Sequence, residues 1–200
     1  MTAISATDVK ALREETGSPM MECKKALEEA GGDLGRAREI LRIKGNKVAD
    51  RKAGRETTQG TIGIYQHHDG KRAAMVLLAC ETDFVARNQK FQELARCLAK
   101  QVVAMSPEYV DRSQVPEESL RKEEELVRAE SAGELQKKPA AAHAKIIEGR
   151  MKKFFEQRCL IDQTYVLDDS QTIEQMIRDA VSALGENIVI KKFARFEIGS

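Results

Sequence analysis

The feature that most constrains this chain is a change in the spacing of apolar residues between positions 74 and 102. Residues 74–79 (AMVLLA) form an unbroken apolar run, which is typical of a buried strand. From residue 91 onward, apolar side chains recur at helical spacing, which predicts a helix over about residues 89–105. Residues 80–88 (CETDFVARN) must then connect a strand to a helix, where rigid elements commonly present functional residues.

This connection carries an aromatic ring beside a carboxylate, Phe84 next to Asp83. Most phenylalanine side chains are buried, so burial statistics favour a Phe84 ring folded into the chain's own core, with Asp83 capping a turn. The alternative is a ring that enters a groove of another protein. The residues of the connection leave both interpretations open and favour the buried ring.

Composition narrows the class of protein. The 33 Lys and Arg residues nearly balance the 32 Asp and Glu residues, so no dominant field for nucleic acid or membrane is expected. No apolar run approaches the ~20 residues of a membrane-spanning helix, and the N-terminus lacks signal-peptide character, so a cytoplasmic location is expected. The four cysteines, Cys23, Cys80, Cys97 and Cys159, lie far apart and are interpreted as reduced core residues.

The chain is predicted to have three parts. Residues 1–45 have the pattern of a small three-helix module, similar in size to ubiquitin-associated (UBA) modules, which bind partners. Residues 46–60 lose the apolar stripe and are predicted to be a basic linker, helical at most in part. Residues 61–200 are predicted to form an α+β core, an antiparallel sheet with packed helices, that serves dimerisation and exchange.

Turn and cap residues predict where the elements of the module end. Ser5 can cap a first helix that stops at Gly17. Ser18 and Pro19 are predicted to cap and open a second helix. Asp33 can cap a third helix, with Gly45 expected beyond its end.

The predicted core alternates strands and helices. Asp69-Gly70 between two β-rich runs predicts a hairpin. The remaining elements are a solvated, highly charged helix at 117–125, a second long helix at 140–158, an extended segment at 160–166, a helix that ends at Gly185, and a last strand at 188–198.

Two features suggest function before any family is considered. Met20 and Met21 are adjacent on a helix, so at least one must be exposed, and an exposed methionine suits an adaptable protein contact; packing at the helix end is the alternative. His67-His68-Asp69 resembles a metal cluster, but neighbouring strand residues point to opposite faces, so no metal site is expected.

Motifs of common enzymes are missing from the sequence. There is no phosphate-binding loop, no nucleophile elbow and no zinc-protease motif, so neither an enzyme nor a bound cofactor is expected. A ubiquitin-like or RNA-binding accessory protein would explain the helical module or the basic linker. Neither alternative explains residues 82–85.

Several stretches resemble the elongation factor Ts family. They include residues 82–85 (TDFV), 16–27 (TGSPMMECKKAL), 146–155 (IIEGRMKKFF), 185–190 (GENIVI) and 193–197 (FARFE). The family has small residues where this chain has Ser-Pro at 18–19, a departure that a first helical turn tolerates. The stretches occur in the family's order, so the chain is identified as a member of its short type, without the second core repeat and coiled-coil insertion of longer members.

This resemblance implies a guanine nucleotide exchange factor that binds elongation factor Tu in its GDP-bound and nucleotide-free forms. Thr82, Asp83, Phe84 and Val85 would disturb the Mg²⁺ site of that GTPase, with Phe84 as the wedge. The last strand, 188–198, has apolar residues on both faces and could be an edge left to pair, so a homodimer is expected. Neither membrane binding nor direct nucleic-acid binding is expected. Further partner contacts are implied at Met20, Met21, Lys24, His67, Leu184 and Gly185.

Overall fold

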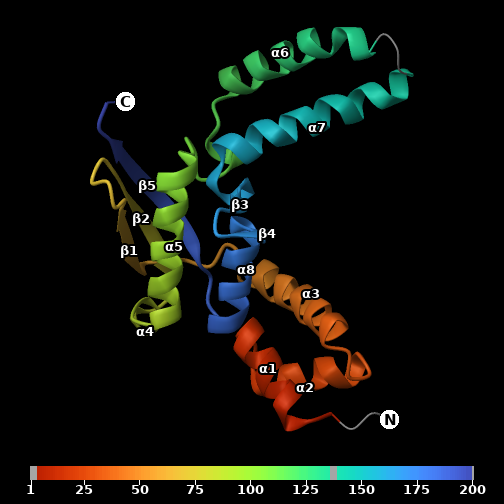
Figure 1. The fold of residues 1–200 in the computed structure, drawn as a ribbon, viewed down its shortest axis with the longest axis vertical. Coiled ribbons are helices and arrows are strands. Elements are labelled where there is room, and N and C mark those ends of the chain that lie inside the picture. The colour runs from red at the N-terminus through yellow and green to blue at the C-terminus, as the bar shows by residue number, and fades with distance from the viewer. Residues whose placement is uncertain (1–3, 136–138, 200) are drawn as a thin grey trace. The chain divides into compact units, whose positions relative to one another are not determined.

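The fold was described from a computed structural model, which covers residues 4–135 and 139–199 (Figure 1). The helices are α1 (Ala6–Thr16), α2 (Met20–Glu29), α3 (Leu34–Lys52), α4 (Asp83–Ala86), α5 (Gln89–Met105), α6 (Glu117–Leu135), α7 (Ala140–Arg158) and α8 (Ile173–Leu184). The strands are β1 (Gln59–Gln66), β2 (Arg72–Cys80), β3 (Thr164–Tyr165), β4 (Asp168–Thr172) and β5 (Val189–Glu197), and short 3-10 turns lie at Arg112–Gln114 and Leu160–Asp162.

The elements form two compact units, which are described separately. The first contains Met1–Gly63, Val76–Arg96 and Gln175–Lys191; the second contains Ile64–Met75, Cys97–Glu174 and Lys192–Ser200. One three-stranded sheet has the order β1-β2-β5, and a small antiparallel ribbon pairs β3 with β4. Helices packed with antiparallel strands confirm the predicted α+β class. The division at residues 45 and 60 and the UBA-like character of the module stay predictions.

The first two helix boundaries follow from caps that the sequence predicts. The Ser5 hydroxyl accepts the Asp8 amide at 3.0 Å, and Gly17 ends α1 in the left-handed region (φ 66°). The prediction for α2 was wrong in detail: Pro19 occupies the N-cap position itself, and no side chain caps the helix. A proline at the N-cap has no hydroxyl to offer, so Ser18 lies one residue too early to cap.

The third helix is longer than expected. Asp33 caps it as predicted, accepting the Arg36 amide at 2.8 Å, but α3 continues past Gly45 to Lys52. A Cβ built on Gly45 would lie 3.1 Å from Ser182 Oγ of α8, so the glycine serves close helix packing and not a helix stop. The same two helices are joined by an ion pair of 2.7 Å between Arg178 and Asp50.

The buried apolar side chains of the first three helices form one cluster, which the spacing of the sequence anticipates. Its members are Val9, Leu12, Cys23, Ala26, Leu27, Ala30, Ala37 and Leu41. In the same unit, Gly63 of β1 lies so close to α5 that a Cβ would be 2.1 Å from the Ala95 carbonyl oxygen. This close approach requires glycine and brings α5 against the hairpin that carries the connection at 80–88.

In the second unit, α6 and α7 pack side by side (Figure 1). The predicted long helix at 140–158 is confirmed, and the predicted charged helix at 117–125 is mostly exposed but continues to Leu135. Val127 of α6 packs with Met151 and Phe154 of α7 in a buried cluster. The predicted stripe was weak because the apolar contacts of α6 lie mostly beyond its acidic first turns.

The strand pair β3–β4 is attached to α5 by a buried amide. Gln101 donates to Gln163 Oε1 at 3.1 Å and to the Thr164 carbonyl at 3.0 Å, and it accepts the Val166 amide at 2.9 Å. These bonds satisfy a side chain that has no exposed surface. The predicted extended segment at 160–166 therefore begins with a 3-10 turn and continues as a short strand.

All four cysteines are free thiols. Cys23, Cys80 and Cys159 are buried and Cys97 is half-buried. Burial, followed by the negative charge of Asp162, raises the pKa of the Cys159 thiol to about 11, so this group stays protonated at neutral pH. Within the described ranges, 4–135 and 139–199, no helix is long and apolar enough to cross a membrane.

Candidate functional site

The connection between β2 and α5 folds into the single-turn helix α4. The Thr82 hydroxyl accepts the Val85 amide at 3.4 Å and so begins the turn. Phe84, one residue into the helix, has 83% of its surface exposed, so the interpretation of Phe84 as a core residue was wrong. The one-turn helix buries Ala86 against the unit, and this orientation turns the Phe84 ring outward. An isolated exposed ring at a loop tip is a typical anchor for a protein partner.

Asp83 and Val85 flank the exposed ring. Asp83 forms an ion pair of 3.0 Å with Arg87 one turn later, and Thr82 rather than Asp83 supplies the cap. Val85 is half-buried. The four residues predicted to act together, Thr82 to Val85, therefore have different local roles: cap, surface carboxylate, exposed ring and partial anchor.

A carboxylate from far along the chain holds the base of this tip. Glu186 accepts the Glu81 amide at 3.0 Å, the Thr82 amide at 2.9 Å and the Thr82 hydroxyl at 2.6 Å. Hydrogen bonds to a charged acceptor are among the strongest in proteins. Glu186 therefore fixes both the backbone and the capping side chain from which α4 begins.

The return contact completes a reciprocal clamp between the tip and the α8–β5 turn. Glu81 accepts the Asn187 amide at 2.7 Å, and the Asn187 side chain donates to the Arg55 carbonyl at 2.8 Å. The bond from the Asn187 amide lowers the pKa of Glu81; partial burial opposes this effect, and the charge of Arg55 adds to it. We call these residues, Glu81, Thr82, Glu186 and Asn187, the tip clamp.

Cys80 adds a further bond to the base of the tip. Its thiol donates to the Thr82 carbonyl at 3.2 Å. Burial and then the charge of Glu186 raise the pKa of Cys80, so the thiol remains protonated and able to donate. The base of the tip is thus half-buried and held by several hydrogen bonds, while its apex is exposed.

The helical module presents the two methionines as predicted. Met20 is 42% and Met21 60% exposed, so both reach solvent at the start of α2. Lys24, one turn later, lies 3.9 Å from Glu28 in an exposed ion pair. Such a pair is weak in water, and the lysine can exchange it for a partner's carboxylate.

The remaining predicted residues lie at two places. Leu184 is half-buried at the end of α8, and Gly185 ends the helix in the left-handed region (φ 74°), directly before Glu186. His67 lies at the β1–β2 turn, in the second unit, with its Nε2 atom 3.9 Å from Asp69. The structure thus joins Gly185 to the tip through Glu186, whereas His67 belongs to a separate group.

The two histidines of the hairpin do not diverge as expected. The rings of His67 and His68 lie 4.2 Å apart between centroids. Both follow the last residue of β1, so the alternation of strand side chains does not apply to them. In the described part of the chain, no group of three or more His, Cys, Asp or Glu side chains is placed to hold a metal ion.

Sequence reasoning missed Glu186 and Asn187 as functional residues. They are more than a hundred positions from the tip, and no local pattern connects segments at that distance. The sequence offered one signal for them. Glu186 and Asn187 directly follow Gly185, which ends the helix, and polar side chains in such a turn commonly form hydrogen bonds with backbone groups.

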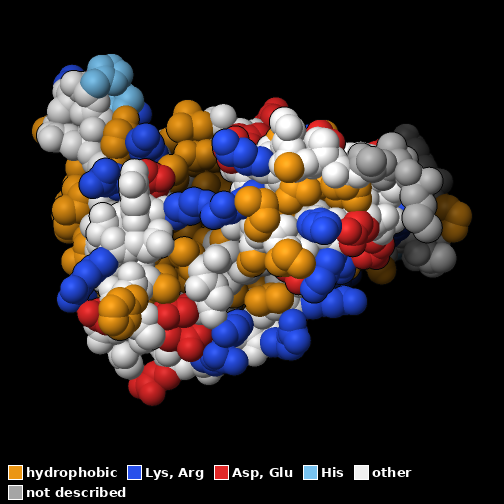
Figure 2. Space-filling view, turned by 90° about the horizontal axis from the view of Figure 1, so that it is seen from below, with side chains coloured by type: hydrophobic (Ala, Val, Ile, Leu, Met, Phe, Trp, Pro, Cys, Tyr) orange, Lys and Arg blue, Asp and Glu red, His pale blue; other side chains and the backbone are white. Residues whose placement is uncertain are grey.

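The surface carries no single dominant charge. In the face shown in Figure 2, basic and acidic side chains are interspersed with apolar ones. This distribution agrees with the near balance of charges in the sequence and offers mixed polar and apolar contacts, which protein interfaces commonly use.

Comparisons with known proteins identify the family of the chain. A family described as Elongation factor TS matches residues 5–200. Elongation factor Ts of Thermotoga neapolitana is 48% identical over 196 residues, 98% of each chain. That of Thermodesulfovibrio yellowstonii is 46% identical over 197 residues, and that of Anaeromyxobacter dehalogenans 48% over 199 residues, which cover 97% and 90% of those proteins. The chain therefore belongs to the elongation factor Ts family of translation elongation factors.

Proposed function

We propose that this protein is a guanine nucleotide exchange factor for elongation factor Tu. The observation that carries the proposal is the exposed Phe84 ring on a tip whose base is held by the tip clamp. An exposed aromatic side chain leaves apolar surface in contact with water, and a partner that covers the ring removes this unfavourable contact. Because hydrogen bonds already hold the base of the tip, little free energy is spent on ordering the tip when the ring binds a partner.

The proposed mechanism involves no covalent step. Elongation factor Tu holds GDP with the help of Mg²⁺, whose charge neutralises phosphate oxygens. A protein that binds the nucleotide-free state more tightly than the GDP state must weaken GDP binding by the same factor. Phe84 acts as the wedge against the GTPase, Asp83 contacts a polar group beside it, and the Mg²⁺ site is disturbed as a result.

The other residues predicted to bind the partner complete the proposed contact. Met20, Met21 and Lys24 anchor the GTPase through the module, and adaptable methionine side chains suit such an anchor. His67, Leu184 and Gly185 contribute secondary contacts. The protein acts in the cytoplasm as an exchange factor, not as an enzyme, and needs no cofactor of its own.

A homodimer belongs to the same proposal. Strand β1 alternates exposed Ile62 and Ile64 with buried Gly63, and β2 alternates exposed Met75 and Leu77 with buried residues. Apolar side chains on the open face of such strands favour packing against another sheet. A second copy of the chain offers that sheet.

The direct test is a measurement of GDP release from elongation factor Tu. Labelled GDP is chased with unlabelled nucleotide, with and without the protein in substoichiometric amount. The proposal expects faster release that saturates with the GTPase concentration. Unchanged release, with no complex by gel filtration after removal of nucleotide, would exclude it.

A further inference from the structure

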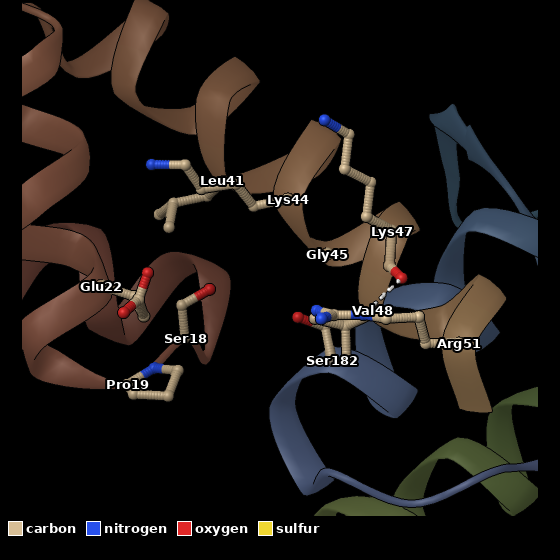
Figure 3. A pocket seen from close by; sticks show the side chains of 10 residues that line it. All are labelled: Ser18, Pro19, Glu22, Leu41, Lys44, Gly45, Lys47, Val48, Arg51 and Ser182. Carbon is tan, nitrogen blue, oxygen red and sulfur yellow. Dashed lines mark hydrogen bonds between the residues drawn. The ribbon is translucent and has the colours of Figure 1, made fainter.

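A groove in the first unit shares no residue with the tip clamp and lies beside the exposed Met20. It has a volume of about 370 Å³ and is enclosed by the start of α2, the middle of α3 and the end of α8. Figure 3 shows Ser18, Pro19 and Glu22 on one wall, facing Val48, Arg51 and Ser182 across the open space. A volume of this size is in the range of ligand-binding pockets, ~300–1,000 Å³.

The floor of the groove is set by close helix packing. Gly45 is buried, and its missing Cβ would lie 3.1 Å from Ser182 Oγ and 3.3 Å from Ser182 Cβ. A larger residue at this position would separate α3 from α8. The close contact of α3 with α8 therefore determines the shape of the groove floor.

Charge in the groove is unbalanced toward the positive. The lining contains Lys44, Lys47 and Arg51 against a single carboxylate, Glu22. Lys44 is already paired with Glu29 at 2.8 Å, and Glu22 with Lys25 at 3.2 Å. Each of these pairs is neutral, so Lys47 and Arg51 are the two groove cations that these pairs do not neutralise.

The two remaining cations have no carboxylate partner in residues 4–135 and 139–199. Arg51 Nε donates to the Lys47 carbonyl at 3.3 Å, which orients the guanidinium along the wall and leaves its terminal nitrogens available (Figure 3). An arginine held in this way can bind a carboxylate through two parallel hydrogen bonds. The Ser182 hydroxyl on the same wall offers a further donor.

Apolar lining distinguishes this groove from a simple anion site. Pro19, Leu41 and Val48 contribute carbon surface between the polar groups. A free phosphate ion would leave that surface in contact with water, whereas a peptide covers it with an aliphatic side chain while its carboxylates meet Arg51 and Lys47. The exposed Met20, next to Pro19, extends the apolar surface at the rim.

We propose that this groove binds an acidic peptide segment of a protein partner, in which glutamate or aspartate alternates with aliphatic residues. The carboxylates bind Arg51 and Lys47, and an aliphatic side chain fills the space over Val48 and Leu41. The groove shares no residue with the tip clamp or with Phe84. Met20 at its rim also belongs to the proposed anchor, so the peptide is tested in the absence of elongation factor Tu and its binding does not report exchange activity.

The test uses the full chain and a labelled short peptide in which glutamates alternate with leucines. Backbone amide spectra recorded during titration are expected to show shifts at Gly45, Val48 and Ser182. Two matched peptides, with glutamine for glutamate or serine for leucine, are each expected to bind at least about tenfold more weakly by fluorescence anisotropy.

Variants of the protein separate the groove from general charge. Lys47→Gln with Arg51→Gln is expected to weaken peptide binding at least about tenfold, while Lys122→Gln with Lys153→Gln removes the same charge elsewhere and leaves binding unchanged. The proposal is overturned if both double variants weaken binding equally, if the glutamate–leucine peptide produces no shifts at the groove, or if inorganic phosphate displaces the peptide at equal concentration.

Discussion

At the scale of single residues, the proposed function depends on a contrast between an exposed apex and a hydrogen-bonded base. Phe84 reaches solvent, while the two amides and the hydroxyl beneath it are bound by Glu186. A side chain that displaces groups of a partner must keep its own position when the partner contacts it. The hydrogen bonds of the tip clamp would hold the tip in this way, and their chemistry leads to two predictions.

The first prediction concerns Glu186. Glu186→Ala leaves the amides of Glu81 and Thr82 without their acceptor, so we expect the free energy of unfolding to fall by ~1–3 kcal/mol. The acceleration of GDP release should fall by a larger factor than the measured binding to elongation factor Tu. Glu186→Gln keeps one acceptor oxygen and should restore part of the rate. Equal loss with both substitutions, or no loss of rate, would show that Glu186 does not position the tip.

The second prediction concerns pH. The pKa of Glu81 is lower in the folded protein than its ordinary value of 4.5, because its charged form accepts the Asn187 amide. The unfolded chain therefore binds the proton more readily, so this contribution to stability is present above pH 4.5 and is lost as the pH falls through the folded pKa. Thermal melts should show a smaller acid-induced drop in Tm for Glu81→Gln than for the unmodified protein. An identical drop would contradict the assignment.

At the scale of elements, the sequence predicted what is local and missed what is distant. Caps at Ser5 and Asp33 and the Asp69-Gly70 hairpin were predictable because each depends on residues within four positions. Gly45 was read as a helix stop because its reason, the contact with Ser182, lies on another helix. The polar strand β4 was missed for a related reason, since its pairing partner decides whether it forms.

Of the candidate site, the exposed methionines were predictable from residue spacing, whereas the exposure of Phe84 was implied only by the family resemblance. Adjacent helical residues cannot share one face, which sufficed for Met20 and Met21. Burial statistics gave the wrong answer for Phe84, because they describe an average ring and not one on a clamped single-turn helix. The role of Glu186 could not be predicted at all, because it connects segments that only the fold brings together.

The prediction at this scale concerns the anchor on α2. Met20→Ser with Met21→Ser should weaken the complex with elongation factor Tu by about tenfold or more, since buried methionine side chains contribute ~1.5–3 kcal/mol each. Because both side chains are exposed in the free protein, Tm should change little. Calorimetric titration and a thermal melt measure the two quantities.

Point substitutions test this anchor better than deletion of the module does. The helix α3 contacts α8 through Gly45 and through the Asp50–Arg178 pair, so removal of the module would also expose α8. Ile43→Ser, another exposed apolar residue of the module, is the matched control. The anchor is refuted if the methionine variant binds as tightly as this control.

At the scale of the whole molecule, the open apolar positions of β1 and β2 predict self-association. Ile62 and Ile64 are exposed on a strand whose intervening residue is buried, a pattern that a monomer would leave in water. We expect light scattering at micromolar concentration to give twice the chain mass of 22.3 kDa. Ile64→Asp should shift the protein toward the monomer without unfolding it, as followed by far-ultraviolet circular dichroism. A mass of one chain for the unmodified protein would contradict this prediction.

The central claim is that Phe84 acts on the partner and not on the fold. A phenylalanine in a core would cost ~3–5 kcal/mol when replaced by alanine, whereas one that is 83% exposed should cost almost nothing. Leu167→Ala, another highly exposed apolar residue outside the predicted site, serves as the control.

The decisive measurement is stopped-flow release of labelled GDP from elongation factor Tu, beside a thermal melt of each variant. The account predicts that Phe84→Ala melts as the unmodified protein does and loses most of the acceleration, while Leu167→Ala keeps it. Removal of Mg²⁺ should narrow the difference between Phe84→Ala and the unmodified protein, because the wedge acts through the metal site. A Phe84→Ala protein that melts early, or that releases GDP as fast as the Leu167→Ala control, would contradict the account.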